Sequence, residues 1–238
     1  MPIFFKRSAL AFALAAAASA GTLTGHVELV SSHDAKVRKH ADYSGVVVWL
    51  EPLAGAPVVS VKAGRAQMVQ KNKTFSPHVL AITVGTVVDF PNFDPIFHNA
   101  FSNYNGQVFD IGLYPPGTTR SLAFRREGVV RVFCNIHPTM SAVIVALKTP
   151  FFATSGKNGA FEIGQVPAGS YRLHVFHERA TEQTLEALTR TIEVRDNEPD
   201  PVTLQISESG YIELPHKNKF GKDYPAAGDP TGYAGSKQ

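Results

Sequence analysis

The stretch Cys134-Asn135-Ile136-His137-Pro138-Thr139-Met140 places a thiol, an imidazole and a thioether at intervals of three residues. Its cysteine is the only one in the 238 residues. A trigonal set of two His and one Cys with a weak axial Met suits copper in electron-transfer sites. The stretch supplies three of these four ligands. For the fourth we predict His98, which lies in Phe97-His98-Asn99 on a separate upstream segment.

Other roles for these residues leave part of the pattern unexplained. A lone cysteine can be a small buried hydrophobe, and a Cys-His pair can be a nucleophile with its base, but neither role needs Met140. Zinc accepts a thiolate and two imidazoles, although its usual ligands do not include a thioether. A c-type haem needs Cys-x-x-Cys-His, and a binuclear copper centre or a redox disulfide needs a second cysteine. Copper is therefore the favoured metal.

The Cys-x-x-His-x-x-Met spacing, with a His-Asn pair upstream, resembles the type I copper site of the cupredoxins. The short ligand loop is most similar to that of the amicyanin-like members. The resemblance covers roughly residues 66–148, and it implies a Greek-key β-sandwich holding one type I copper. It also implies that Asn99 ties the two ligand segments together, and that the copper ligands are His98, Cys134, His137 and Met140.

The resemblance further implies that the protein transfers single electrons between redox partners that dock transiently. In cupredoxins the loop histidine reaches the surface through an apolar patch. Here we predict such a patch around His137, formed by Ile96, Phe97, Pro138 and Pro95. Ordinary packing at the end of the barrel is the alternative role for these four residues.

Short runs rich in Val, Ile, Phe and Tyr recur between Gly and Pro residues, and they predict an all-β chain. In the strand expected over residues 129–133, alternation carries Cys134 inward with Val130 and Val132. Residues 141–147 are expected to return as the closing strand, so the ligand loop is anchored at both ends. The continuous apolar run of residues 46–50 predicts a strand covered on both faces.

A second pattern follows the copper-site segment. Thr154-x4-Gly159-x-Phe161, then Pro167-Ala168-Gly169-x-Tyr171, resembles the small prealbumin-like β-sandwich called the carboxypeptidase regulatory-like domain. This resemblance implies a second sandwich over residues 149–206. Because that family opens with strands similar to residues 25–30 and 45–51, we expect residues 21–64 to belong to it, with the cupredoxin unit of residues 65–148 inserted. The alternative is that the early strands belong to the cupredoxin barrel.

Residues 1–20 have the pattern of an export signal: Lys6 and Arg7, an apolar run, and Ala18-Ser19-Ala20 as the cleavage site. We therefore expect a periplasmic protein with no membrane span in the mature chain; a retained N-terminal anchor is the alternative. Without the signal the chain is nearly neutral, which gives no support for nucleic-acid binding. An unpaired thiol in an oxidising compartment also favours a bound metal that protects it.

The remaining histidines are interpreted as structural. Residues 31–44 read as a solvated polar loop, His78 lacks the context of a ligand, and His174 and His177 point to opposite faces of a strand. Residues 180–188 form a short helix or a loop. Residues 207–238 are polar and rich in Gly, Pro and Lys, which predicts a flexible tail in which His216 has no partner.

Two functions remain open on these grounds. The first is an electron carrier with one type I copper, and the second is a copper-binding, delivery or structural binding protein. We expect no enzyme, because an oxidase needs His-x-His pairs for a further copper cluster, and the sequence has none. Amicyanin-like proteins serve methylamine oxidation, but the resemblance fixes neither the redox partner nor the oligomeric state.

Overall fold

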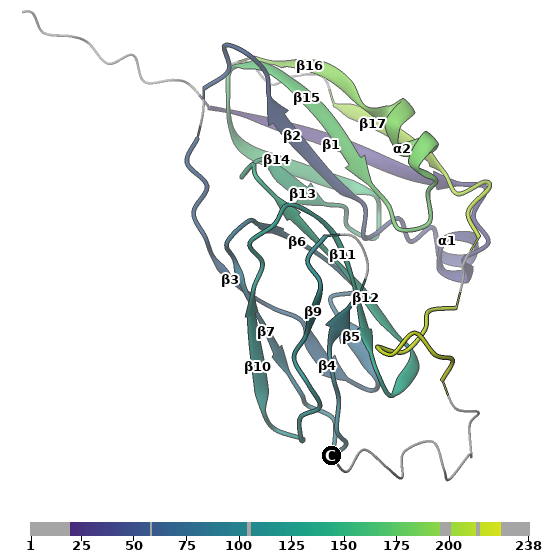
Figure 1. The fold of residues 1–238 in the computed structure, drawn as a ribbon. Helices are drawn as coiled ribbons and strands as arrows, with labels where there is room; N and C mark the ends of the chain where they lie inside the picture. Colours follow the sequence, from purple (N-terminus) through teal and green to yellow (C-terminus); the bar gives the residue numbers. More distant parts are fainter. Residues whose placement is uncertain (1–19, 58, 104–105, 196–200, 213–214, 225–238) are drawn as a thin grey trace, which may run out of the picture.

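The computed structural model describes residues 20–57, 59–103, 106–195, 201–212 and 215–224. Nearly all of the expected export signal lies outside these residues. Strands dominate the described chain, which confirms the all-β prediction. They form two β-sandwiches, one in the lower and one in the upper part of Figure 1.

The lower sandwich is built from residues 65–147. One of its sheets has the order β6-β12-β11-β8-β9, the other has the order β10-β7-β3, and a small hairpin of β4 and β5 lies beside them. The strands are β3 (Arg65–Gln67), β4 (Val69–Lys71), β5 (Thr74–Ser76), β6 (Val79–Thr83), β7 (Val87–Pro91), β8 (Phe101–Ser102), β9 (Phe109–Asp110), β10 (Thr119–Ala123), β11 (Gly128–Cys134) and β12 (His137–Leu147).

The upper sandwich combines strands from both ends of the chain. Its sheets have the orders β14-β1-β17 and β13-β2-β15-β16. In the first sheet, β1 pairs antiparallel with β14 and parallel with β17; in the second, β2 lies between β13 and β15. The strands are β1 (Ala20–Val30), β2 (Val47–Pro52), β13 (Phe152–Thr154), β14 (Ala160–Pro167), β15 (Gly169–Phe176), β16 (Arg190–Val194) and β17 (Val202–Ser207).

Three apolar layers separate the four sheets, and the middle layer joins the two sandwiches. Strand β12 explains how. Alternate side chains of β12 (Ala142, Ile144, Ala146) enter the lower core, whereas the intervening ones (Val143, Val145, Leu147) pack against the upper sandwich. A strand covered on both faces must be apolar throughout, as residues 142–147 are.

Strand β2 meets β12 and β6 from the other side of this middle layer. Val46, Val48 and Leu50 lie in the upper core, while Val47 and Trp49 face the lower sandwich. This arrangement confirms the prediction that residues 46–50 are covered on both faces. The two sandwiches therefore share an apolar boundary.

Two short helices occur among the described residues. The polar segment of residues 31–44 is not wholly a loop: it contains α1 (Ala35–His40), capped by the Asp34 side chain, with Val37 buried in the upper core. Six residues are too few to show a helical period in the sequence. For residues 180–188, where a short helix or a loop was expected, the structure has helix α2 (Glu182–Leu188). Within the described residues, neither helix has the length and hydropathy to cross a bilayer.

Candidate metal centre

The ligand stretch forms the end of the β11–β12 hairpin. Cys134 pairs directly with His137 across the turn made by Asn135 and Ile136, and the register shifts between Phe133 and Cys134. The closing strand thus begins at His137 and not at Ser141 as the sequence suggested, because one further pair, Cys134 with His137, follows the pair of Phe133 with Ser141 after the register shift. Cys134 and His137 face each other as a result, and both are held by the sheet.

His98 reaches the same point from the segment before β8. Its backbone exchanges hydrogen bonds with Tyr114, at 3.1 Å from His98 N to Tyr114 O and 2.9 Å in return. The loop that precedes it is shaped by Asn92, whose side chain donates to Ile96 O and accepts from Asp94 N. Phe101 of β8 then pairs with Phe133 of β11. These bonds fix His98 beside Cys134.

The side chains of His98, Cys134 and His137 converge. Sγ of Cys134 lies 3.8 Å from Nδ1 of His98 and 3.5 Å from Nδ1 of His137. All three ligand atoms lie within 4.8 Å of one another, and no other group of three or more His, Cys, Asp or Glu does so in the described part of the chain. Metal–nitrogen and metal–sulfur bonds are about 2.0 to 2.3 Å long, so ligands of one ion lie roughly 3 to 4 Å apart. The donor set fits a single metal ion.

Burial distinguishes the four predicted ligands. His98, Cys134 and Met140 are fully buried, and Cys134 and Met140 belong to the same apolar core. His137 is half-buried. A soft donor set in an apolar, water-poor setting suits copper better than hydrated cations, and His137 is the member of the set nearest to solvent.

Asn99 connects the two ligand segments. Its Oδ1 accepts a hydrogen bond from the backbone N–H of Asn135 at 3.3 Å, and its Nδ2 donates to Asp110 Oδ1 at 2.7 Å. The residue is almost fully buried. Asn99 therefore bridges the His98 segment and the ligand hairpin, in the place that the resemblance implies.

Asp94 is a site residue that the sequence reasoning missed. Nε2 of His98 donates to Asp94 Oδ2 at 2.7 Å. Because a carboxylate only accepts, the proton of the ring lies on Nε2, and Nδ1 presents its lone pair towards Cys134. Although burial raises the pKa of Asp94, hydrogen bonds from Lys73 N, His98 and Asn72 N lower it overall. The available signal was an acidic residue four positions before the ligand, within the same loop.

Opposing influences act on the Cys134 thiol. Burial holds the pKa of the thiol above its ordinary value, although the backbone N–H groups of Ile136, Asn99 and His137 point at the sulfur and partly offset this effect. Burial also lowers the pKa of His137, which favours the neutral ring that a metal requires. The N–H groups would stabilise negative charge on a thiolate.

The apolar residues expected around His137 are partly exposed. Phe97 is 50% exposed, Pro95 and Pro138 are exposed, and Ile96 is half-buried. Phe93, in the same loop as Phe97, is 62% exposed. Exposed aromatic side chains on the loop that leads to His98 agree with a small docking surface.

The segment after β17 returns to the metal centre, and it corrects one prediction. Figure 1 shows this yellow segment reaching the lower sandwich. His216, expected to have no partner, stacks on Phe133 with ring centroids 4.2 Å apart and lies 3.2 Å from the Tyr224 hydroxyl. The Tyr224 hydroxyl in turn donates to Cys134 O at 2.8 Å. The pattern of polar residues could not reveal contacts so distant in sequence.

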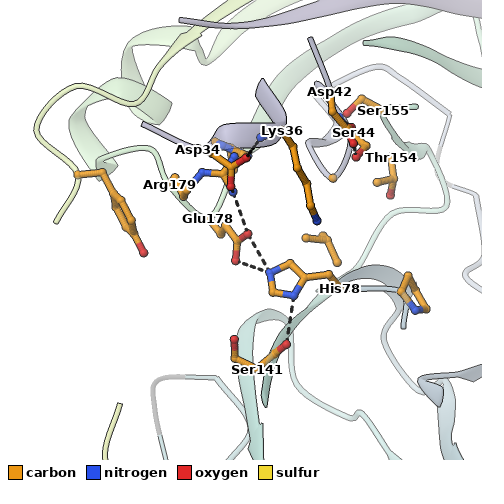
Figure 2. Close-up of a pocket in the computed structure, with 15 residues that line it drawn as sticks. Asp34, Lys36, Asp42, Ser44, His78, Ser141, Thr154, Ser155, Glu178 and Arg179 are labelled. Atoms are coloured by element: carbon orange, nitrogen blue, oxygen red, sulfur yellow. Dashed lines mark hydrogen bonds and ion pairs between the residues drawn. The ribbon is translucent and has the colours of Figure 1, made fainter. Parts of the chain in front are cut away.

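A polar cavity of about 540 Å³ lies where the two sandwiches meet. Figure 2 shows the His78 ring between the Glu178 carboxylate and the Ser141 carbonyl, at 2.8 and 3.1 Å. The hydrogen bond with Glu178 raises the pKa of His78. Arg179 contacts Glu178 and Asp34, so the charges of this cavity are largely satisfied by one another. The contact between His78 and Glu178 links the two sandwiches.

The two histidines near the end of β15 also have structural partners. His174 stacks on Trp49 and lies 3.0 Å from Glu51 Oε2. His177 is buried with its Nε2 2.9 Å from Glu208 Oε1. These contacts agree with the interpretation that neither is a metal ligand.

Comparison with known proteins gives partial likenesses. No protein-family model matches. The methylamine utilization protein MauL of Methylorubrum extorquens is 40% identical over 60 residues, 25% of this chain and 53% of that protein, so the match spans about half the length of that relative. A novel purple cupredoxin from Nitrosopumilus maritimus is 30% identical, covering 34% of this chain and 99% of its own, with a TM-score of 0.32. A reduced amicyanin variant is 20% identical, covering 39% and 96%, with a TM-score of 0.33.

Proposed function

We propose that this chain is a type I copper protein that transfers single electrons between redox partners in the periplasm. The ligands of its one copper are His98, Cys134, His137 and Met140. The observation that carries the proposal is the convergence of one sulfur and two imidazole nitrogens within 4.8 Å. Met140 is fully buried and belongs to the same core as Cys134. This donor set is typical of copper electron-transfer sites.

Copper, when bound, supplies the one-electron change between Cu(II) and Cu(I). The chain supplies ligands whose positions are fixed by the surrounding fold. Cys134 and His137 are paired across a hairpin, and His98 is fixed by its backbone and by Asp94. Ligands held by sheet and hydrogen bonds keep one geometry in both oxidation states, which favours rapid exchange. Half-buried His137 is the ligand through which a docked partner exchanges the electron.

Redox proteins that dock transiently at the exposed Phe93 and Phe97 are the proposed partners. Such electron-transfer encounters use small interfaces. Because the relative with 40% identity is named a methylamine utilization protein, amine-oxidising redox enzymes are the partner class to test first. We assign no catalytic reaction to the chain. The division into an inserted metal sandwich of residues 65–148 and a flanking second sandwich is part of the same proposal.

A copper-binding, delivery or structural role is the second candidate, and the upper sandwich favours it. Nearly half of the described chain lies in a unit that shares an apolar layer with the metal sandwich and adds no ligand to the site. A carrier exchanges one electron reversibly and retains its copper. A delivery protein releases copper to an acceptor. Cyclic voltammetry and transfer to a chelator separate these two behaviours.

The first prediction is the visible spectrum of the purified protein after Cu(II) addition. We expect an intense blue or purple absorption from the Cys134 thiolate. The absorption should disappear in Cys134→Ser and shift in Met140→Leu, because the first removes the thiolate and the second only the weak thioether donor. Met68→Leu is the matched control, since Met68 is equally buried in the same core, and its spectrum should be unchanged. A colourless complex of the unsubstituted protein would contradict the electron-carrier proposal.

A further inference from the structure

The segment from His216 to Tyr224 has an internal structure of its own. Asn218 organises it: its backbone N–H donates to Lys222 O at 2.8 Å, and its Oδ1 accepts from Phe220 N at 2.9 Å and Lys222 N at 3.1 Å. The ion pair between Lys217 and Asp223 closes the turn. A segment folded in this way can present fixed contacts to a neighbour.

The neighbour is the cysteine end of the ligand hairpin. The backbone N–H of Lys219 donates to Asn135 Oδ1 at 2.9 Å, and its Nζ donates to Asp110 Oδ2 at 2.8 Å. Together with the two bonds of Asn99 described above, these complete a closed ring through Asn99, Asp110, Lys219 and Asn135. The ring joins both ligand segments to the C-terminal segment.

A second contact acts on the cysteine itself. The Tyr224 hydroxyl donates to the carbonyl oxygen of Cys134 at 2.8 Å. The His216 ring supports it by lying against both Tyr224 and Phe133. Phe133 and Asn135, the two neighbours of Cys134 in the sequence, also contact this segment. Phe133 stacks on His216, and Asn135 accepts the hydrogen bond from Lys219.

We propose that residues 216–224 are a strap that belongs to the metal centre, with Lys219 and Tyr224 as positioning residues that hold Cys134 and Asn135 in place. The inference deepens the proposed copper function and rests on it. Groups that orient metal ligands through hydrogen bonds affect metal retention and electronic structure without touching the metal. The strap makes such bonds from outside the metal sandwich.

The test uses the full chain with Tyr224→Phe and Lys219→Ala, each of which deletes one strap contact, and Lys219→Arg as the conservative replacement. Tyr211→Phe and Lys222→Ala are the matched controls: Tyr211 lies before the strap, and Lys222 bonds within it through its backbone. Unfolding midpoints in urea identify any variant that is globally destabilised. If Lys219→Ala is destabilised in this way, the milder substitution Tyr224→Phe alone carries the test.

The first readout needs no metal. Cys134 is the only thiol and is fully buried, so its alkylation by iodoacetamide in the metal-free protein reports local opening of the hairpin. We expect Tyr224→Phe to react roughly fivefold faster, the factor for one lost neutral hydrogen bond. Lys219→Ala should react roughly two- to fivefold faster, the factor for one lost, partly exposed ion pair. Lys219→Arg and both controls should react at the original rate. If Cys134 is alkylated at the same rate in all variants, the proposal of a strap is overturned.

The second readout is the copper form. We expect the two strap variants to shift the visible absorption and to release copper to a chelator faster, whereas a merely structural contact changes only the unfolding midpoint. If the unsubstituted protein gives no intense absorption, the proposed function fails, while the alkylation result still decides whether the strap holds Cys134. If that protein is coloured and the strap variants match it in spectrum, release and alkylation, the strap inference alone is overturned.

Discussion

His98 is held by both of its ring nitrogens. Nδ1 faces the sulfur of Cys134, and Nε2 donates to Asp94, which is itself fixed by the backbone N–H groups of Asn72 and Lys73. The carboxylate thus selects the tautomer and fixes the ring plane. A histidine with a carboxylate behind it is a more basic ligand than a free one.

Asp94→Asn tests this role. We expect the copper affinity to fall by roughly 10- to 100-fold, the usual cost of losing such a partner, because the amide removes the charge and brings N–H groups towards two existing donors. Competition against a chelator measures the change. Asp89→Asn is the matched control: Asp89 is a buried carboxylate of β7 that bonds Arg65 and Ser121 and no predicted ligand. If both variants lost copper affinity equally, Asp94 would have no specific role in holding the metal ligand His98.

The sequence predicts site residues well where the chemistry is local. The three-residue spacing brings Cys134 and His137 together across a tight turn, and the His-Asn pair indicates where the upstream segment approaches. Asp94 was within reach of the same reasoning, since it shares a loop with His98. Lys219 and Tyr224 were not, because their role depends on where the chain returns after β17, and no residue pattern near them records that return.

At the scale of single elements, the packing of β1 requires a glycine at position 25. Gly25 pairs with Phe161 of β14 on one side and Val202 of β17 on the other. A Cβ built there would lie 2.3 Å from the Phe161 ring and 2.4 Å from Val202 O. The central strand of this sheet therefore accepts only glycine where the ring crosses it.

Gly25→Ala should lower the free energy of unfolding by about 1 to 3 kcal/mol, the usual effect of overpacking a core. Urea unfolding followed by far-ultraviolet circular dichroism measures it. Gly164→Ala in β14 is the control, because its added methyl group meets nothing within 4 Å. If the two variants were equally stable, the packing of Phe161 over β1 would be wrong.

Elements were predictable from sequence in proportion to their length and alternation. Strands β1, β2 and β11 follow their apolar patterns, with ends displaced by up to five residues from the ranges 25–30, 45–51 and 129–133. Helix α1 was missed because its formation depends on a side-chain cap from Asp34 and one buried contact of Val37. The start of β12 at His137 depends on pairing with Cys134, which a residue pattern does not encode.

At the scale of the whole molecule, Glu208 connects its own segment after β17 to two segments distant in sequence. Its carboxylate bonds Ser32 after β1, His177 after β15, and Arg179. Burial alone would raise the pKa of Glu208, but the hydrogen bonds from His177, Arg179 and Ser32 lower it to about 2. Relative to its ordinary value of 4.5, the depressed pKa is worth about 3 kcal/mol of stability.

This stabilisation has a defined pH range. It is complete above pH 4.5, where the carboxyl is ionised even in the unfolded chain, and it is lost as the pH falls towards about 2. We expect Glu208→Gln to be less stable than the unsubstituted protein at pH 7, with a smaller difference at pH 3. Urea unfolding at pH 7 and at pH 3 measures this difference in stability. Glu162→Gln, at an exposed position of β14, should leave stability unchanged at both pH values, and a pH-independent deficit in Glu208→Gln would contradict the assignment.

The pairing of β1 with β14 and β17 has a consequence for how the chain is made. Ribosomes release a protein from its amino end, so residues 20–30 emerge long before residues 160–167 and 202–207. The strands of residues 65–147 find all their neighbours within one continuous stretch, whereas β1 and β2 must wait with open edges. Waiting strands of this kind are targets for unwanted association and for chaperones. Strand β1, the first strand of the structure to be synthesised, is thus among the last to find its partners.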